Sequence, residues 1–533
     1  MSKNGAVELA WKLMKQRRWE EASKQLEEII NENEGLVPLK AYLGLGRAYR
    51  EQYLFQQAEE ILDKGKTKYL ENHEYLIELA KVSMDKKEWL NAVARWDEAI
   101  DRIKDQVKPP TIYIGLEKAF RELGLLYHAE ITAKEGVQQH PNNAKLLVCY
   151  AQLLMRKKKW DEAITYWLKL LEIKDYSMSF DHYQKIAKCY IQTGCTDSVD
   201  YYIRLGLKTV FGLNVRKELK RVKSSINKEF DKIDSNFTYL GGAHNLAIIE
   251  HSCQTEKGTK EYITKICDSK KERNSIKNEK LFNKSIREKY QILKTISPEL
   301  INITKSQNRT VSFITFEKVE SIAVEEDINK IVNLSNVISS INPSEYANSI
   351  KPPNFFSKDT KLFFRYFTTI HEETSNRKVF RWLKRKLKSL ECDSKEIKII
   401  KQLESTIVKN KLFEQIDPNK NYSFFHGDFK SDNILNSKEL DTNYIIDWTN
   451  YNIGPKGLDM TIYFNDRDMA FSEIDTNYLS NEKTNLNVLE KVVMIYSLIV
   501  YRFTKVDRKR YKEDHIDFIQ PAVRKMEQLL LDR

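Results

Sequence analysis

"SFFHGDFKSDNILNSKELDTNYIIDWTNYNIGP", residues 423–455, is the stretch that decides how the second half of this chain folds. It sets a His-Gly-Asp motif ending at Asp428 behind one apolar run, then Asn433, then Asp447 behind a second apolar run. Short β-branched and aromatic runs bounded by Gly, Asn and Asp predict strands joined by loops. The polar residues are therefore expected in loops at strand ends, where site residues are often carried.

The spacing of these residues fits the pattern H-x-D-x-x-x-x-N followed by a further Asp, which indicates phosphoryl transfer. In that chemistry Asp428 orients the attacking hydroxyl and accepts its proton. Asn433 and Asp447 would hold magnesium, which prefers oxygen ligands and keeps phosphate oxygens and water around it. His426 is interpreted as a brace for the loop backbone, and an exposed turn histidine is the plainer alternative.

A turn at Gly241 and Gly242 lies between two predicted strands of "NFTYLGGAHNLAIIEHSC". Glycine lets a backbone approach a phosphate with its amides free to donate. The next strand, "EYITKIC", carries Lys265 among apolar residues, at about the distance where a strand lysine holds nucleotide phosphates. An ordinary hairpin with a solvent-facing lysine is the alternative interpretation.

A lysine of that kind needs a carboxylate partner, which the following helix supplies. Glu279 is the preferred partner, and Glu272 and Glu288 stay open because the sequence does not decide which helix face points inward. Two more strands follow, and the second would lead into a hinge between Phe316 and Val319, where backbone groups hold an adenine.

These residues resemble the aminoglycoside phosphotransferase and choline kinase family, a branch of the protein-kinase-like fold, over about residues 234–533. Gly427 and Trp448 stand where protein kinases carry Arg and Phe, which favours the small-molecule branch. The resemblance is carried by His426-Gly427-Asp428, Asn433, Ile446-Asp447-Trp448, Gly454-Pro455 and Asp459, and in the front part by Gly241, Gly242, Asn245 and Lys265.

The resemblance implies a bilobal α+β domain, with an N-lobe at about residues 234–320 and a C-lobe at about 321–533. It implies ATP and Mg2+ as cofactors and an active enzyme, with Lys265 and Asp428 in catalysis, and with Asp459 anchoring the catalytic loop beside His426. The implied nucleotide-binding residues are Gly241, Gly242, Asn245, Lys265, Glu279, Phe316 and Val319.

The front half, residues 1–212, has an internal repeat of about 35 residues. In each unit a small residue follows a bulky one by three positions: Trp19/Ala22, Phe55/Ala58, Trp89/Ala92, Leu126/Ala129, Trp160/Ala163 and Cys195/Ser198. Such a period predicts about six helix pairs stacked as a solenoid, and the units resemble tetratricopeptide repeats. We expect this all-α domain to dock a protein partner, and a rigid spacer or dimerisation arm is the alternative. A linker helix is predicted at residues 213–233.

The composition narrows the class of protein. The formal net charge is +12, from 88 basic and 76 acidic residues, which mildly favours acidic partners or an anionic membrane surface. No CxxC pair, signal-type segment or long uncharged apolar run occurs, so reduced thiols and a cytoplasmic location are expected. No nucleic-acid-reading module is recognised.

The acceptor is the least defined part of the prediction. An O-phosphotransferase acting on a small molecule or a glycan-linked hydroxyl (a sugar or an amino alcohol) is expected, with bacterial surface polysaccharide biosynthesis as a hypothesis. Asp466, Asp468 and Glu473 would hold an amine or are plain surface charges. A nucleotide-binding scaffold with an inactive kinase fold and a protein kinase acting on a docked partner are the alternatives.

Overall fold

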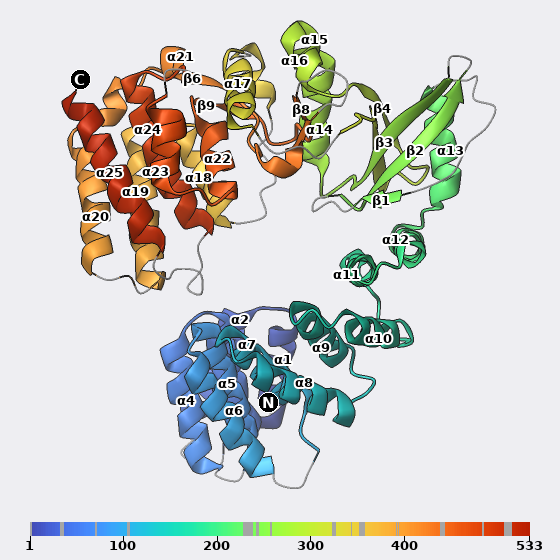
Figure 1. Cartoon of the computed structure of the whole chain (residues 1–533). Helices are drawn as coiled ribbons and strands as arrows, with labels where there is room; N and C mark the ends of the chain where they lie inside the picture. Colours follow the sequence, from blue (N-terminus) through green and yellow to red (C-terminus); the bar gives the residue numbers. More distant parts are fainter. Residues whose placement is uncertain are drawn as a thin grey trace. The chain divides into compact units, whose positions relative to one another are not determined.

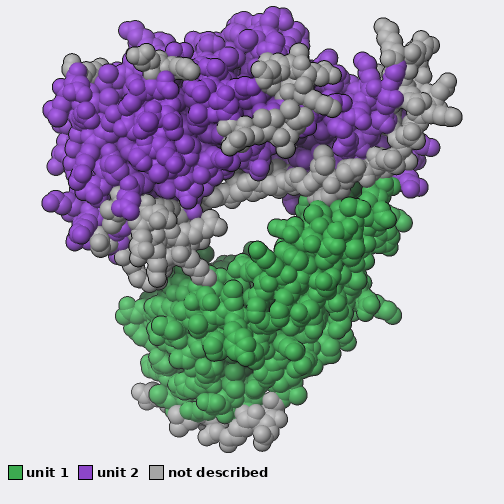
Figure 2. Space-filling view, in the orientation of Figure 1, with its two compact units in different colours: residues 1–210 green, residues 211–533 purple. Residues whose placement is uncertain are grey.

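The computed structural model of the chain has two compact units, residues 1–210 and residues 211–533 (Figure 2). The residues that the structure describes are 3–31, 37–69, 72–103, 107–226, 238–240, 245–255, 258–321, 327–342, 344–350, 358–390, 392, 394–436, 443–481, 484–505 and 514–532. Gly241 and Gly242, predicted to contact phosphates, lie outside them.

The first unit consists of helices in sequential pairs (Figure 1). The pairs are α1 (Lys3–Lys15) with α2 (Trp19–Asn31), α3 (Leu39–Glu51) with α4 (Phe55–Lys68), α5 (Glu74–Lys86) with α6 (Trp89–Ile103), α7 (Pro110–Glu122) with α8 (Leu126–Gln139), α9 (Ala144–Arg156) with α10 (Trp160–Leu171), and α11 (Phe180–Gln192) with α12 (Thr196–Phe211). This confirms the predicted helical repeat fold.

Close packing explains the small residues of the repeat. Ala22, Ala58, Ala92, Ala129 and Ala163 are fully buried where neighbouring helices meet. A Cβ added at Gly46 would lie 2.5 Å from Leu62, and one at Gly115 would lie 2.4 Å from Trp96. A larger side chain at these positions would push the helices apart, so the repeat period records where the helices touch.

The second unit opens with α13 (Val215–Ile226) and a five-stranded antiparallel sheet of order β1-β2-β3-β5-β4 (Figure 1). Helix α13 packs against β4, and in the turn after β4 the backbone N–H of Gln307 donates to the Glu218 carboxylate at 3.1 Å. The strands are β1 (Thr238–Leu240), β2 (Ala247–Thr255), β3 (Gly258–Asp268), β4 (Leu300–Lys305) and β5 (Val311–Glu317). Between β3 and β4 lie α14 (Arg273–Leu281), a π-helical turn (Phe282–Ile286), α15 (Arg287–Lys289) and α16 (Gln291–Ile296). The predicted strands and helix of this region are present.

The rest of this unit is mainly helical and surrounds two short strand pairs, β6 with β9 and β7 with β8. The strands are β6 (Tyr422–Phe425), β7 (Ile434–Asn436), β8 (Asn443–Ile445) and β9 (Asn452–Pro455). The helices are α17 (Ile328–Ser339), α18 (Lys358–Phe367), α19 (Glu373–Leu390), α20 (Ser394–Glu404), α21 (Pro418–Asn421), α22 (Leu458–Asp466), α23 (Phe471–Ile474), α24 (Val488–Lys505) and α25 (Asp514–Leu531). Helix α24 is buried along nearly its whole length and contacts α18, α22 and α25. Helix α22, which packs on α24, carries Asp459 to the loop after β6.

Candidate functional site

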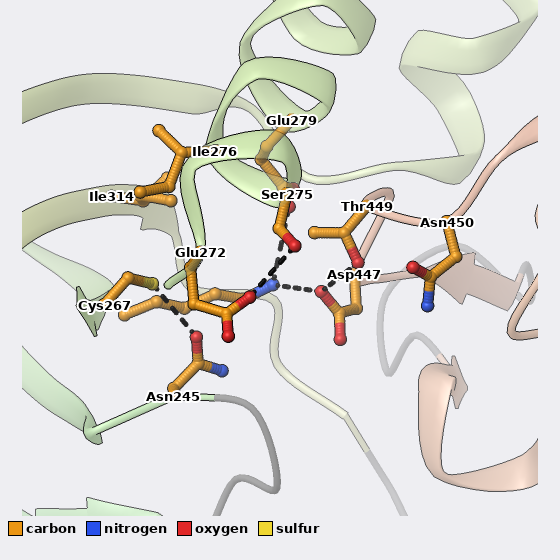
Figure 3. Close-up of a pocket in the computed structure, with 11 residues that line it drawn as sticks. Asn245, Cys267, Glu272, Ser275, Ile276, Glu279, Ile314, Asp447, Thr449 and Asn450 are labelled. Carbon is orange, nitrogen blue, oxygen red and sulfur yellow. Dashed lines mark hydrogen bonds and ion pairs between the residues drawn. The ribbon is translucent and has the colours of Figure 1, made fainter. Parts of the chain in front are cut away.

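Lys265 is buried in the middle of β3, opposite Ile248 of β2 and Ile314 of β5. Its ammonium Nζ donates to Asp447 Oδ1 at 2.9 Å and lies 3.8 Å from Glu279 Oε2 (Figure 3). The same ammonium lies 5.3 Å from the centre of the Phe316 ring. Burial alone would lower the pKa of Lys265, but the two carboxylates outweigh it and raise the pKa. Lys265 is therefore a protonated cation held between two anionic groups.

The three carboxylates considered as partners of Lys265 lie in different surroundings. Glu279, on α14, is 1% exposed and ion-pairs with Lys265. Glu272 lines a small cavity that also includes Lys265, and it accepts a hydrogen bond from Ser275 at 3.0 Å (Figure 3). Glu288 is more than half exposed and ion-pairs with Lys294 at 2.7 Å. The structure therefore brings Glu279, rather than Glu288, to the lysine.

Few favourable contacts offset the cost of burying the Glu279 carboxylate. Its Oε2 makes no hydrogen bond to any described residue. Burial raises the pKa of Glu279 to about 7, against a partial lowering by Lys265, and Asp447 adds a further rise. The raised pKa of Glu279 means that one lysine does not fully stabilise both neighbouring carboxylates as anions, and a metal ion or a further cation would favour the charged form of Glu279.

His426 and Asp459 hold the loop that follows β6. Asp459, near the start of α22, accepts the backbone N–H of His426 at 3.0 and 2.9 Å and that of Gly427 at 3.1 Å. Burial outweighs these bonds and raises the pKa of Asp459 to about 7. His426 is fully buried, which lowers its pKa to about 4. The neutral ring donates from Nε2 to the Ile446 carbonyl at 3.1 Å and accepts the Asp428 N–H at Nδ1 at 3.3 Å.

Gly427 occupies a position that other residues cannot take. Its φ is +81°, in the left-handed region, and an added Cβ would lie 2.2 Å from the backbone oxygen of Asn450. The glycine that the sequence prediction read as a family marker is thus required by the close approach of two loop backbones.

Asp428, Asn433 and Lys430 form a second polar cluster. The Asn433 amide Nδ2 donates to the Asp428 carbonyl at 2.8 Å and to its Oδ2 at 2.9 Å. Lys430 Nζ lies 3.1 Å from the same Oδ2, and although burial opposes it, the carboxylate of Asp428 raises the pKa of Lys430. The sequence prediction missed Lys430, although a lysine two residues after the predicted base was a visible signal.

Asp447 has an unusual backbone conformation, with a φ of +67°. The Thr449 N–H donates to the Asp447 carbonyl at 2.8 Å, which closes a tight turn. Non-glycine residues in this region carry strain, and such strain concentrates at functional sites. Next to it, Trp448 stacks on Phe282 with ring centres 4.1 Å apart and donates from Nε1 to the Ile445 carbonyl at 3.0 Å.

Helix α14 is tied to this turn by Asn278. Its Nδ2 donates to the Thr449 carbonyl at 2.9 Å, and its own carbonyl accepts the Tyr451 hydroxyl at 3.1 Å. Because Glu279 is the next residue, these bonds also set its position. Sequence spacing cannot reveal Asn278, since its partners lie far along the chain.

A mostly apolar cavity opens beside Lys265. Its lining includes the predicted hinge residues Phe316 and Val319, together with Ile263, Leu435 and Ile446, and Lys265, Glu279 and Asp447 form its polar end. A second, smaller cavity includes Asn245, whose Oδ1 accepts from the Cys267 thiol at 3.1 Å (Figure 3). A mostly apolar cavity that also contains charged groups suits a nucleotide, with its base against the apolar residues and its phosphates towards the lysine.

The residues proposed for magnesium suit that ion. Within the described ranges no cluster of three or more His, Cys, Asp or Glu side chains that could form an all-protein metal cage occurs. Asn433 uses its Nδ2 for both bonds to Asp428, which leaves its Oδ1 for a cation, and Asp447 supplies a carboxylate. Magnesium is commonly bound by one or two such groups plus phosphates and water.

The carboxylates considered for an amine acceptor are already engaged. Asp468 is 2.7 Å from the Arg502 guanidinium, and Asp466 is 3.8 Å from Lys505 Nζ. Glu473 accepts the Ala470 N–H at 3.3 Å and caps α23. Two of the three carboxylates are therefore paired with cations, and the third caps a helix.

The comparisons with known proteins agree with this geometry. Residues 360–482 match the family model described as the phosphotransferase enzyme family, and this range includes Asp428, Asn433, Asp447 and Asp459. This match supports a kinase-type phosphotransferase in the C-terminal unit. The chain carries this region behind a helical repeat domain, and the predicted family resemblance is confirmed for residues 360–482.

Solved structures resemble the helical repeats. PilF of Pseudomonas aeruginosa shares 13% identity with a TM-score of 0.34, covering 42% of this chain and 97% of its own. A tetratricopeptide repeat protein from Parabacteroides merdae shares 13%, with a TM-score of 0.31, covering 42% and 84%. YrrB, a tetratricopeptide repeat protein, shares 13%, with a TM-score of 0.29, covering 37% and 97%. A search of curated proteins returned no match.

Among the described residues, no helix has the length and apolar character needed to cross a membrane.

Proposed function

We propose that the second unit is an ATP- and Mg2+-dependent O-phosphotransferase that moves the γ-phosphate of ATP to a hydroxyl of a small molecule or a glycan-linked acceptor. The observation that carries the proposal is the convergence of Lys265, Asp447 and Glu279 at the charged end of an apolar cavity. Phosphoryl transfer depends mainly on positioning and on neutralising phosphate charge, and this set of groups supplies both.

Lys265 would hold phosphate oxygens of the nucleotide. It now bonds Asp447 at 2.9 Å, and Glu279 is farther, at 3.8 Å. When phosphates enter, Lys265 can turn from Asp447 towards them while Glu279 keeps it in place. Asp447 and the Oδ1 of Asn433 would then hold magnesium, which neutralises phosphate charge.

Asp428 would orient the acceptor hydroxyl and take its proton. Its carboxylate is positioned by the Asn433 amide at 2.9 Å and by Lys430 at 3.1 Å. Asp459 and His426 support the loop from behind through backbone hydrogen bonds. We propose Lys430 as an additional group near the transferred phosphate, because its ammonium adjoins the proposed base.

The acceptor class is proposed from the surroundings of Asp428. Asp466 and Asp468 are each paired with a cation, so an uncharged sugar-type hydroxyl fits better than an amine. The repeat unit is proposed to dock a protein partner or acceptor carrier. Bacterial surface polysaccharide biosynthesis remains the proposed setting, and the domain division at 1–212, 213–233 and 234–533, a cytoplasmic location and contact with an anionic membrane surface remain proposals with it.

The test follows the labelled γ-phosphate of ATP in the presence of magnesium. The purified full chain is incubated separately with neutral sugars, amino alcohols and cell-envelope glycans, alongside Asp428→Asn and the control Asp517→Asn, which changes an exposed residue of α25. We expect transfer to a hydroxyl acceptor that Asp428→Asn loses and the control keeps. Bound ATP without transfer to any acceptor would instead favour a nucleotide-sensing scaffold, and transfer to protein side chains would favour a protein kinase.

A further inference from the structure

Helix α19 of the second unit has two faces of opposite character. Its inner face belongs to the core of the unit, where the helix packs on α18, α20 and α24 (Figure 1). Between residues 377 and 388, every exposed side chain of the helix is a cation. We call these side chains the basic face, and they are Arg377, Lys378, Arg381, Lys384, Arg385 and Lys388.

Four of these cations form a row along the outside of the helix. Lys378, Arg381, Arg385 and Lys388 follow one another at intervals of three or four positions, so they lie on the same side of an α-helix. The row is about 15 Å long, because each helical residue adds about 1.5 Å. We call these four residues the central row.

The acidic neighbours of the basic face are engaged at its edges. Arg377 donates to Glu373 at 2.6 Å, and Lys384 donates to Glu404 at 2.9 Å. The central row, in contrast, forms no ion pair with any residue that the structure describes. The positive charge in the middle of the face is therefore unopposed, and it is available to an anionic partner.

Helix α18 adds to this positive charge. The Tyr366 ring lies between two cations, with Lys378 Nζ 5.7 Å and Arg365 Cζ 5.9 Å from its centre. Asp359, the acidic residue that α18 brings to α19, is held by Lys386 at 2.8 Å. Arg365 thus extends the basic face onto α18, and the nearby acidic group is already paired.

The surroundings of the basic face favour a lipid surface over a nucleic acid. A DNA major groove admits a helix, but α19 is packed against three neighbouring helices and cannot enter one. Binding of single strands relies on aromatic side chains that stack on bases, and the ring of Tyr366 is already in contact with two cations. Four to eight basic residues on an amphipathic helix are typical of contact with anionic lipid headgroups.

We propose that the basic face of α19 binds an anionic membrane surface, with the central row against the lipid phosphates. The apolar side chains of the helix, among them Val379, Leu383 and Leu387, are buried in the core. The contact is therefore electrostatic and stays at the level of the headgroups, without insertion of the helix. This inference deepens the membrane contact named in the proposed function by giving it a surface, and it does not depend on phosphoryl transfer.

The test measures sedimentation of the full chain with vesicles of phosphatidylcholine alone and with vesicles that also contain phosphatidylglycerol. We expect binding to the anionic vesicles only, and a steep loss of binding as salt is raised, because salt screens exposed charges. The double variant Arg381→Glu with Arg385→Glu should weaken binding at least about tenfold. The neutral pair Arg381→Gln with Arg385→Gln should weaken it in the same direction but less.

The matched control is Lys12→Glu with Lys15→Glu, which makes the same change in net charge at two exposed lysines of α1. It should bind anionic vesicles as the unmodified protein does, and circular dichroism should report equal helix content for all variants. Absence of vesicle binding, equal binding to both kinds of vesicle, or an equal loss in the control and the α19 variants would overturn the proposal. Tighter binding of a single-stranded oligonucleotide than of vesicles, lost in the α19 variants, would overturn it in favour of a nucleic acid.

The two proposals fail separately. If Asp428→Asn abolishes transfer while the full chain binds no anionic vesicle, only the membrane inference is wrong. If the vesicles bind as expected and no acceptor receives phosphate, only the proposed phosphotransferase is wrong.

Discussion

Two buried glutamates, one in each unit, are stabilised in opposite ways. Glu78 of the repeat unit contacts Lys81 at 2.7 Å, Arg47 at 3.0 Å and Arg50 at 3.6 Å. Burial alone would raise the pKa of Glu78, but these three cations together lower it. Glu279 of the second unit has one cation at 3.8 Å, and burial raises its pKa to about 7.

The contrast distinguishes Glu78, whose charge stabilises the fold, from Glu279, whose charge is available for a function. Three cations offset the burial of Glu78, as expected where the group serves only the packing of helices. The second unit leaves charge uncompensated beside a cavity, which is the arrangement expected at a functional site. Variants at the two kinds of position should therefore behave differently.

The largest effect is expected for Lys265→Met, which keeps the length of the side chain and removes its charge. Transfer should fall by about a hundredfold to a thousandfold in kcat/KM, because a charged donor to phosphate is lost. Steady-state kinetics with a saturating acceptor measures this loss. The matched variant Lys134→Met in the repeat unit should leave kcat/KM unchanged.

A sharp test of geometry compares two glycines with nearly equal backbone angles. Gly427 has a φ of +81° and Gly124 a φ of +80°, but only an added Cβ at Gly427 meets another atom, 2.2 Å away. Gly427→Ala should cost about 3 kcal/mol or more and abolish transfer, whereas Gly124→Ala should cost only about 1 kcal/mol of backbone strain. Urea denaturation of both variants checks this, and equal costs would contradict the proposed close approach of Gly427 to Asn450.

The two glutamates should give opposite pH dependences. Because the folded pKa of Glu279 is raised, its contribution to stability is complete below its unfolded pKa and is lost as pH rises to about 7. Glu279→Gln should therefore gain stability relative to the unmodified protein, by roughly 1–3 kcal/mol, between about pH 5 and pH 8.

Glu78→Gln should show the reverse. The folded pKa of Glu78 is lowered, so its contribution is present above the unfolded pKa and is lost as pH falls through the folded pKa. The variant should be destabilised at neutral pH and approach the unmodified protein in acid. Hydrogen exchange of the backbone amides in α5 and α14 measures local stability at the two sites separately. The same pH response at both sites would contradict the expected difference between the two glutamates.

The smallest effect is expected for Lys430→Ala. The ammonium of Lys430 lies 3.1 Å from the proposed base but is not the sole group that holds it, since Asn433 also donates to Asp428. We expect a loss of about tenfold in kcat/KM with little change in ATP affinity. The matched variant Lys420→Ala, at an exposed lysine paired with Asp417, should be neutral, and a neutral Lys430→Ala would exclude that lysine from the reaction.

The repeat fold could be predicted from the sequence because the same kind of helix contact, marked by a small residue, recurs in every unit. Ala58 and Ala92 are each one member of a periodic set, so the pattern is visible without knowing which helices touch. It did not reveal Glu117, which is buried in α7 and pairs with Arg121 at 2.9 Å. A pattern of small residues gives no information about a buried charged residue that does not follow the repeat period.

The candidate site was predictable where its residues follow one another closely. His426, Asp428 and Asn433 lie in one loop, and their bonds to each other follow from that loop. Contacts such as the Asn278 amide to the Thr449 carbonyl depend on how distant segments pack. Such contacts cannot be predicted from the spacing of residues along the chain. The acceptor cannot be predicted for the same reason, because its site is also formed by distant segments.

The most direct measurement of the central claim is calorimetric titration of ATP, with and without magnesium, into the unmodified chain, Asp447→Asn and Asp428→Asn. We predict that magnesium strengthens ATP binding to the unmodified chain and to Asp428→Asn, and that Asp447→Asn loses this magnesium dependence. Asp428→Asn should bind ATP normally while failing to transfer its phosphate. ATP binding that is absent, or that responds to magnesium equally in Asp447→Asn, would contradict the assignment of this site to phosphoryl transfer.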